Sequence, residues 1–274
     1  MYGRDPWQRT GYSHGYPYAP RSPWKAIFGR VNWLIVAGFV ALLGLCLYAL
    51  IRMPTQYGVL ASVGLVVTGW IFSLCLHEFA HAATAVLGGD TSESTASYLT
   101  FNPFRYLHPV YSIVLPVLFL LLGFIALPGG AVYLRRDLVR SRGWQSAISF
   151  AGPAMNMLFV LVVTAPFSLG YITRYPQLGP ALAALAFFQC AAIILNLLPI
   201  PGLDGFGIIA PWLPRELLAV LYPLANAGML ILFIAIWQIP AIGAAYFGTV
   251  DHLLTSLHVD PFQALTGLQL LRFH

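Results

Sequence analysis

Two histidines and one glutamate lie close together inside a strongly apolar stretch of this chain. His77, Glu78 and His81 form the pattern His-Glu-x-x-His. If the stretch is a helix, His77 and His81 are one turn apart on the same face, so both imidazoles can bind one Zn²⁺. Glu78 is then placed to accept a proton from a water molecule at the metal. The alternative is a polar cluster that joins helices, which is costly because three ionisable side chains would be buried without a metal.

A catalytic zinc site also needs a third protein ligand and an open position. Asp204 is the main candidate, because among the nine acidic residues only Glu78 and Asp204 lie in or against strongly apolar segments. Pro199 and Pro201 cannot continue a regular helix, so we expect Asp204 on a bent segment that can reach a neighbouring helix. The carboxylate could instead cap a helix, and His108 is a second candidate for the third ligand.

The composition indicates the kind of protein that carries these residues. Of the 274 residues, 59% are hydrophobic and only 8% are charged, and the mean hydropathy is +0.77. These values exclude an ordinary water-soluble globule and a disordered chain. The three cysteines lie inside apolar runs and do not form a disulfide framework. The sequence therefore predicts an all-α, polytopic membrane helical bundle.

Long apolar runs predict about five to six transmembrane helices and one possible re-entrant segment. The runs cover residues 31–51, 59–87, 110–127, 145–170, 181–200 and 217–239, with a weaker run at 240–258. We expect three regions: a disordered cytoplasmic tail at 1–28, a membrane-embedded metal-binding domain at 29–258, and a C-terminal tail at 259–274.

Basic residues predict how the chain is oriented. Arginines and one lysine precede the first run, and four arginines lie at 135–142, so both the N-terminus and the second cluster are expected to be cytoplasmic. His77, His81 and Asp204 can share one metal only if runs 59–87 and 181–200 cross in the same direction. One of the two runs between them must then not cross, and the cluster at 135–142 indicates run 110–127, which we expect to be re-entrant or to lie on the surface.

Three segments, in this order, resemble a known family. They are His-Glu-Phe-Ala-His at 77–81, Ala-Gly-Pro-Ala-Met-Asn at 151–156, and Asn-Leu-Leu-Pro-Ile-Pro-Gly-Leu-Asp-Gly at 196–205. Together they resemble the site-2 protease family of intramembrane zinc metalloproteases, in its compact branch without a PDZ or CBS domain. The resemblance covers about residues 59–210. It departs from many relatives at Phe206-Gly207, after the aspartate.

The resemblance implies a role for each matched polar residue. His77, His81 and Asp204 would bind one Zn²⁺ per chain, and Glu78 would be the catalytic base. Asn156 and Asn196 would position the substrate backbone or stabilise the oxyanion. Hydrogen bonding between helices is the alternative role for both asparagines.

The resemblance also implies the reaction and its setting. It predicts hydrolysis of peptide bonds within or near transmembrane segments of membrane proteins, in the lipid bilayer of a bacterial inner membrane. We expect no nucleic-acid partner, and the sequence does not predict an oligomeric state. Two other functions stay open: a divalent-metal transporter that uses the same ligands, and a catalytically inactive membrane scaffold.

Overall fold

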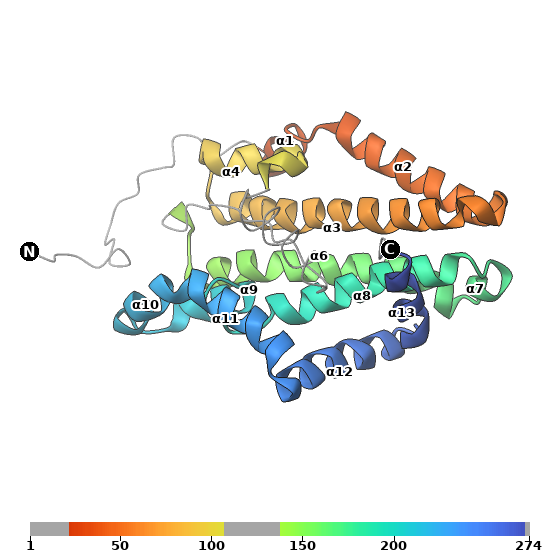
Figure 1. The fold of residues 1–274 in the computed structure, drawn as a ribbon. Coiled ribbons are helices and arrows are strands. Elements are labelled where there is room, and N and C mark those ends of the chain that lie inside the picture. The colour runs from red at the N-terminus through yellow and green to blue at the C-terminus, as the bar shows by residue number, and fades with distance from the viewer. Residues whose placement is uncertain (1–21, 107–137, 272–274) are drawn as a thin grey trace, which may run out of the picture.

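The computed structural model describes residues 22–106 and 138–271, and its elements are all helical within these ranges (Figure 1). The all-α membrane bundle that the sequence predicts is confirmed. The run 110–127 and His108 lie outside the described residues.

Four helices are long and apolar enough to cross a membrane. They are α2 (Trp33–Arg52), α3 (Gly58–Gly88), α6 (Arg142–Ser168) and α8 (Leu178–Asn196). A fifth span is possible if α10 (Arg215–Leu221), η7 (Tyr222–Leu224) and α11 (Ala225–Gln238) form one crossing that bends by 61°. These helices match the apolar runs of the sequence, because each run has the length that a hydrocarbon core of about 30 Å requires.

The spanning helices begin and end at residues with clear local reasons. The side chain of Asn32 accepts hydrogen bonds from the first backbone N–H groups of α2, and that of Ser141 does so for α6. α3 ends at Gly88, and the next residue, Gly89, has a φ of 111°, in the left-handed region that glycine adopts without strain.

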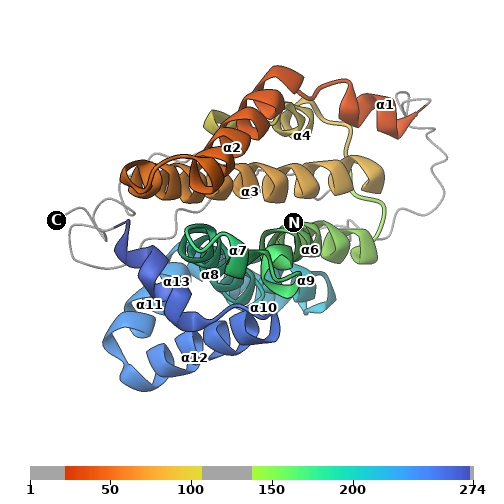
Figure 2. The ribbon, with the colours of Figure 1, turned by 90° about the vertical axis from the view of Figure 1, so that its right-hand side faces the viewer.

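The helix α8 forms the centre of the bundle. In its apolar window 78% of the residues are buried, against 11% in α2. Its buried face contains many alanines, and small side chains of this kind let helices approach closely in a membrane. Figure 2 shows α8 with α6, α12 (Pro240–Ser256) and α13 (Pro261–Gln269) around it, whereas α2 lies at the edge against α3. Many apolar side chains of α2 are therefore exposed among the described residues, as expected of a helix at the lipid boundary.

The direction of each helix decides which ends meet. The backbone N–H of Arg140 donates to the carbonyl of Gly88 at 3.0 Å, so α6 begins where α3 ends. In Figure 1, α6 runs back along α3, and α8 returns toward α9 (Asp204–Ile209). α3 and α8 therefore run in the same direction, as a shared metal site requires.

Both ends of the described chain contain short helices where the sequence analysis expects tails. In α1 (Pro23–Phe28), Ile27 is buried against Ala82, Val86 and Leu99. α13 packs on α8 so closely that a Cβ on Gly267 would lie 1.9 Å from the carbonyl oxygen of Pro180. These helices are too short to appear as apolar runs, and only their packing on longer helices identifies them.

Two further elements link the start of α2 to the segment after α3. The backbone N–H of Asn32 donates to the carbonyl of Thr100 in η2 (Tyr98–Thr100). Arg30 binds Glu93 of α4 (Glu93–Ser97) with both guanidinium nitrogens, the shorter contact being 2.7 Å. Residues 93–100 are thereby tied to the start of α2, and α4 and η2 also contact α3.

Candidate metal centre

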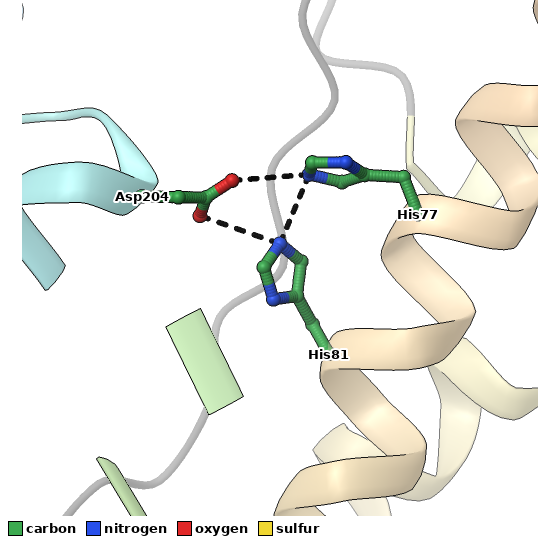
Figure 3. Close-up of side chains that lie close together, drawn as sticks. All are labelled: His77, His81 and Asp204. Carbon is green, nitrogen blue, oxygen red and sulfur yellow. Dashed lines mark hydrogen bonds and ion pairs between the residues drawn. The ribbon is translucent and has the colours of Figure 1, made fainter. Parts of the chain in front are cut away.

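The two histidines of the motif lie on one face of α3. His77 and His81 are both buried, with 7% of each residue exposed. Because they are four residues apart in a helix, their rings point the same way, and their Nε2 atoms are 3.0 Å apart (Figure 3). The helix alone therefore brings two nitrogen ligands together.

Asp204 brings a carboxylate to the same place from the other side of the site (Figure 3). Its Oδ2 lies 3.2 Å from Nε2 of His77, and its Oδ1 lies 3.3 Å from Nε2 of His81. Each of the three residues offers one ligand atom, and these atoms all lie within 4.8 Å of one another. Asp204 thus lies at the histidines, as the sequence predicts for the third ligand, whereas the other candidate, His108, lies outside the described residues.

The loop between α8 and α9 determines the position of this carboxylate. Gly202 has a φ of 99°, and the chain turns there before α9 starts at Asp204. A Cβ on Gly205 would lie only 2.2 Å from the carbonyl oxygen of Leu197, so the turn is tight against the end of α8. The bent segment that the prolines predict is therefore present, and it folds back toward α3.

Ser146 of α6 forms hydrogen bonds to the segment that begins at Asp204. Its hydroxyl donates to the carbonyl of Ile208 at 2.6 Å and accepts from the indole N–H of Trp212 at 2.9 Å. Ile208 lies in α9, which begins at Asp204, and Trp212 ends the short helix that follows α9. One serine side chain thus connects the Asp204 segment to α6.

The Nδ1 atom of each histidine has its own hydrogen-bond partner. His77 Nδ1 lies 2.5 Å from Oδ1 of Asn156, and His81 Nδ1 lies 2.6 Å from the carbonyl oxygen of Ile148. Both partners are acceptors, so each Nδ1 carries the hydrogen and each Nε2 keeps a free lone pair. This arrangement is typical of histidines that bind a metal through Nε2.

Gly152 provides the space that a metal centre needs. A Cβ on this residue would lie 2.4 Å from Nε2 of His81 and 2.5 Å from Nε2 of His77. Any larger side chain at 152 would occupy the region in front of the two nitrogens. Two imidazoles and one carboxylate are also a donor set found in catalytic zinc sites, so the residues present fit Zn²⁺.

The Asp204 carboxyl can supply the negative charge that a divalent cation requires. Its two oxygens face Nε2 of His77 and Nε2 of His81. An ionised carboxylate is the form that binds a divalent cation.

The remaining predicted site residues take different places. Glu78 is 3% exposed and follows His77 on α3, inside the bundle. Asn156 contacts His77, as described above. Asn196 is the last residue of α8, and within the described residues its side chain makes no hydrogen bond to His77, His81 or Asp204.

Sequence reasoning did not identify the roles of Gly152, Ser146 and the Ile148 carbonyl. Gly152 stands in the segment Ala-Gly-Pro-Ala-Met-Asn, but a glycine carries no chemical signal of what lies beside it. A backbone carbonyl carries none in any sequence.

Comparison with known proteins connects this geometry to a reaction. Over 209 residues the chain is 40% identical to a Mycolicibacterium smegmatis protein named "Putative zinc metalloprotease Rip2", covering 76% of this chain and 80% of that protein. A Mycobacterium tuberculosis protein of the same name is 39% identical over 209 residues, and the Bacillus subtilis "Putative zinc metalloprotease YwhC" is 28% identical over 205 residues, 61% of this chain and 90% of that protein. No family model and no solved structure matches the chain.

The helical membrane fold, the group of residues that could hold a metal and these relatives together define a membrane-bound metalloprotease that uses Zn²⁺. More specifically, the chain belongs to the site-2 protease family, as the three sequence segments predict.

Proposed function

We propose that this chain cleaves peptide bonds within or near transmembrane segments of membrane proteins. The observation that carries the proposal is the depth of the site. His77 stands 11 residues before the end of the 31-residue helix α3, which places it about 17 Å along the axis from that end. A buried site within a spanning helix favours a substrate that is itself in the membrane over a folded soluble protein.

The proposed ligands are His77, His81 and Asp204, and the proposed base is Glu78. When bound by these residues, Zn²⁺ would supply Lewis-acid chemistry, which lowers the pKa of water and polarises a carbonyl. Glu78 takes the proton of the attacking water and delivers it to the leaving amine. Burial of Glu78 keeps bulk water away from this proton transfer.

The substrate must reach these residues in an extended form. In a helix each backbone amide is hydrogen-bonded within the chain and covered by side chains. We therefore expect the substrate segment to unwind locally before cleavage. Asn196, at the end of α8, is the residue proposed to bind the unwound backbone. For Asn156 the contacts favour the alternative role, because its buried amide already bonds to His77, Ser73 and Gln189.

We further propose that the end of the bundle where α3 stops faces the cytoplasm, so that the N-terminus is cytoplasmic and the protein lies in the bacterial cell membrane. Arg140 and Arg142 lie beside the end of α3, and Arg30 is paired with Glu93 just after it. Basic residues of this kind favour the cytoplasmic side. The proposed membrane domain then extends from α1 to α13.

The test compares the purified wild-type protein with Glu78→Gln on a model transmembrane substrate. Wild type should cleave it, and Glu78→Gln should lose at least about 100-fold in turnover, the usual size of a general acid–base contribution. The variant should still contain zinc, since Glu78 is not a proposed ligand.

Other outcomes would point to other functions. A wild-type protein that binds zinc but cleaves no transmembrane substrate, and that moves zinc across vesicles, would be a transporter. A protein that neither binds zinc nor cleaves would be an inactive scaffold. Undiminished cleavage by Glu78→Gln would remove Glu78 from its proposed role.

A further inference from the structure

A buried hydrogen-bonded network lies on the Nδ1 side of His77, opposite to Nε2. It joins three helices through Ser73 of α3, Asn156 of α6 and Gln189 of α8, none of them more than 5% exposed. Asn156 Nδ2 donates to Gln189 Oε1 at 2.8 Å and to Ser73 Oγ at 3.1 Å, and the Ser73 hydroxyl donates to Gln189 Oε1 at 2.5 Å. Buried polar groups in a membrane helix bundle are costly unless they are paired, so we ask what this network does for the residues beside it.

The network determines which way the oxygen and the NH₂ group of the Asn156 amide point. Gln189 Oε1 can only accept, so it attracts the NH₂ group of Asn156 toward α8. The amide oxygen of Asn156 is thereby turned to His77, 2.5 Å from Nδ1. Because that oxygen accepts, His77 carries its hydrogen on Nδ1 and presents an unprotonated Nε2.

The opposite orientation of the Gln189 amide would change the tautomer of His77. If the NH₂ group of Gln189 faced Asn156, the Asn156 amide would turn its own NH₂ group to His77. Nδ1 would then have to accept, and the hydrogen of the neutral ring would sit on Nε2, where a metal ligand needs a lone pair.

One polar atom of the network has no partner among the described residues. It is the buried Nε2 of Gln189. Turning the Gln189 amide would put Oε1 in that place and direct Nε2 toward Ser73 and Asn156. The orientation shown is the one in which the Ser73 hydroxyl, the Asn156 NH₂ group and His77 Nδ1 can all donate.

We propose that Gln189 and Ser73 are positioning residues for the metal centre. Acting through Asn156, they hold His77 in the tautomer and ring orientation that offer Nε2 to the metal. This inference rests on the ligand set of the proposed function, but it concerns metal binding and not cleavage.

The test measures zinc affinity by competition with a chelator, in purified full-length protein. Gln189→Leu, which has a similar volume but no acceptor, should bind zinc about tenfold or more weakly, the usual effect of losing a residue that orients a metal ligand. Gln189→Glu keeps an acceptor oxygen and lacks the orphaned donor, so it should restore the affinity to near the wild-type value. Ser73→Ala should give a smaller loss, because the bond between Asn156 and Gln189 remains.

A matched control is Thr164→Val. Thr164 is also a buried polar residue of α6, but its hydroxyl bonds only to backbone carbonyls of its own helix. This variant should bind zinc like the wild type. The visible absorption spectrum of the Co²⁺-loaded protein gives a second readout, since it should change in Gln189→Leu, return in Gln189→Glu and stay unchanged in Thr164→Val.

The outcomes separate this inference from the proposed function. If wild type binds zinc and Gln189→Leu binds it equally tightly, or if Gln189→Glu is as weak as Gln189→Leu, the positioning role is wrong and the ligand set stands. If the wild-type protein does not bind zinc, both the positioning role and the proposed ligand set are wrong. If Gln189→Leu fails to fold, Ser73→Ala and Gln189→Glu decide: no loss in Ser73→Ala, or a loss in Gln189→Glu, overturns the inference.

Discussion

Gly152 of α6 lies directly against the imidazole of His77 on α3, so that a Cβ on residue 152 would come within 2.5 Å of the Nε2 atom of that histidine. The two residues are far apart in the sequence, and the contact exists only because α3 and α6 pack closely side by side. The space that the missing side chain leaves open is the space in front of the proposed ligand atoms.

Gly152→Ala should therefore abolish tight zinc binding. The added methyl group would overlap both Nε2 atoms, and His77 or His81 would have to turn away. We expect a loss of zinc affinity of at least tenfold, measured as zinc per chain after dialysis and by chelator competition. Gly143→Ala is the matched control, because Gly143 is exposed on the same helix and its Cβ would meet only the Ser141 hydroxyl, at 3.8 Å. Equal zinc binding by both variants would contradict the site geometry.

Asp204→Asn should lose zinc while Glu78→Gln keeps it. The asparagine preserves the shape of the side chain, but its neutral amide is a weaker ligand for a divalent cation than a carboxylate. We expect affinity to fall by tenfold or more and cleavage to disappear with it. Asp251→Asn, an exposed aspartate of α12, is the control for a change of one charge. An Asp204→Asn protein with one tightly bound zinc would show that this carboxylate is not a ligand.

Ser146→Ala should loosen the segment that carries Asp204. The variant loses the bond to the Ile208 carbonyl and the acceptor of the Trp212 indole, which together amount to about 1–3 kcal/mol of stability. We expect Ser146→Ala to have a lower melting temperature than the wild type and a zinc affinity reduced severalfold. Trp212→Phe keeps the Ile208 bond, so both its melting temperature and its zinc affinity should lie between those of Ser146→Ala and the wild type. Ser256→Ala removes an exposed hydroxyl that bonds only to its own helix and should change neither quantity. A Ser146→Ala protein indistinguishable from this control would rule out the anchoring role.

The ion pair between Arg30 and Glu93 should make the stability of the protein depend slightly on pH. The Arg30 guanidinium holds the pKa of the Glu93 carboxyl below its usual value. The contribution of the pair to stability is thus present above the ordinary pKa of a glutamate and is lost as the pH falls through the lowered value. Both side chains are exposed, so the contribution is small and weakens in salt. An NMR titration of the Glu93 carboxyl should show its pKa rising in Arg30→Gln, and an unchanged pKa would mean that the pair does not form in solution.

Several features of the fold and the site follow from local properties of the sequence. The apolar runs predict α2, α3, α6 and α8 because a membrane span requires about 20 consecutive apolar residues. The spacing of His77 and His81 places them on one helical face, and the prolines before Asp204 predict a break in the chain there. The short helices α1 and α13 leave no such pattern, because their stability depends on the surface that they cover.

The sequence by itself determined the membrane class, the long helices and the placement of His77 and His81 on one helical face, because helix length and the four-residue spacing are properties of neighbouring residues. Only the tertiary structure decided that both oxygens of Asp204 face the two Nε2 atoms, that Asn156 bonds to His77, and that Gly152 leaves the space between them open. Those contacts join segments that are tens of residues apart, and they depend on which helix faces pack together and at what depth each helix ends. No pattern of neighbouring residues specifies that packing.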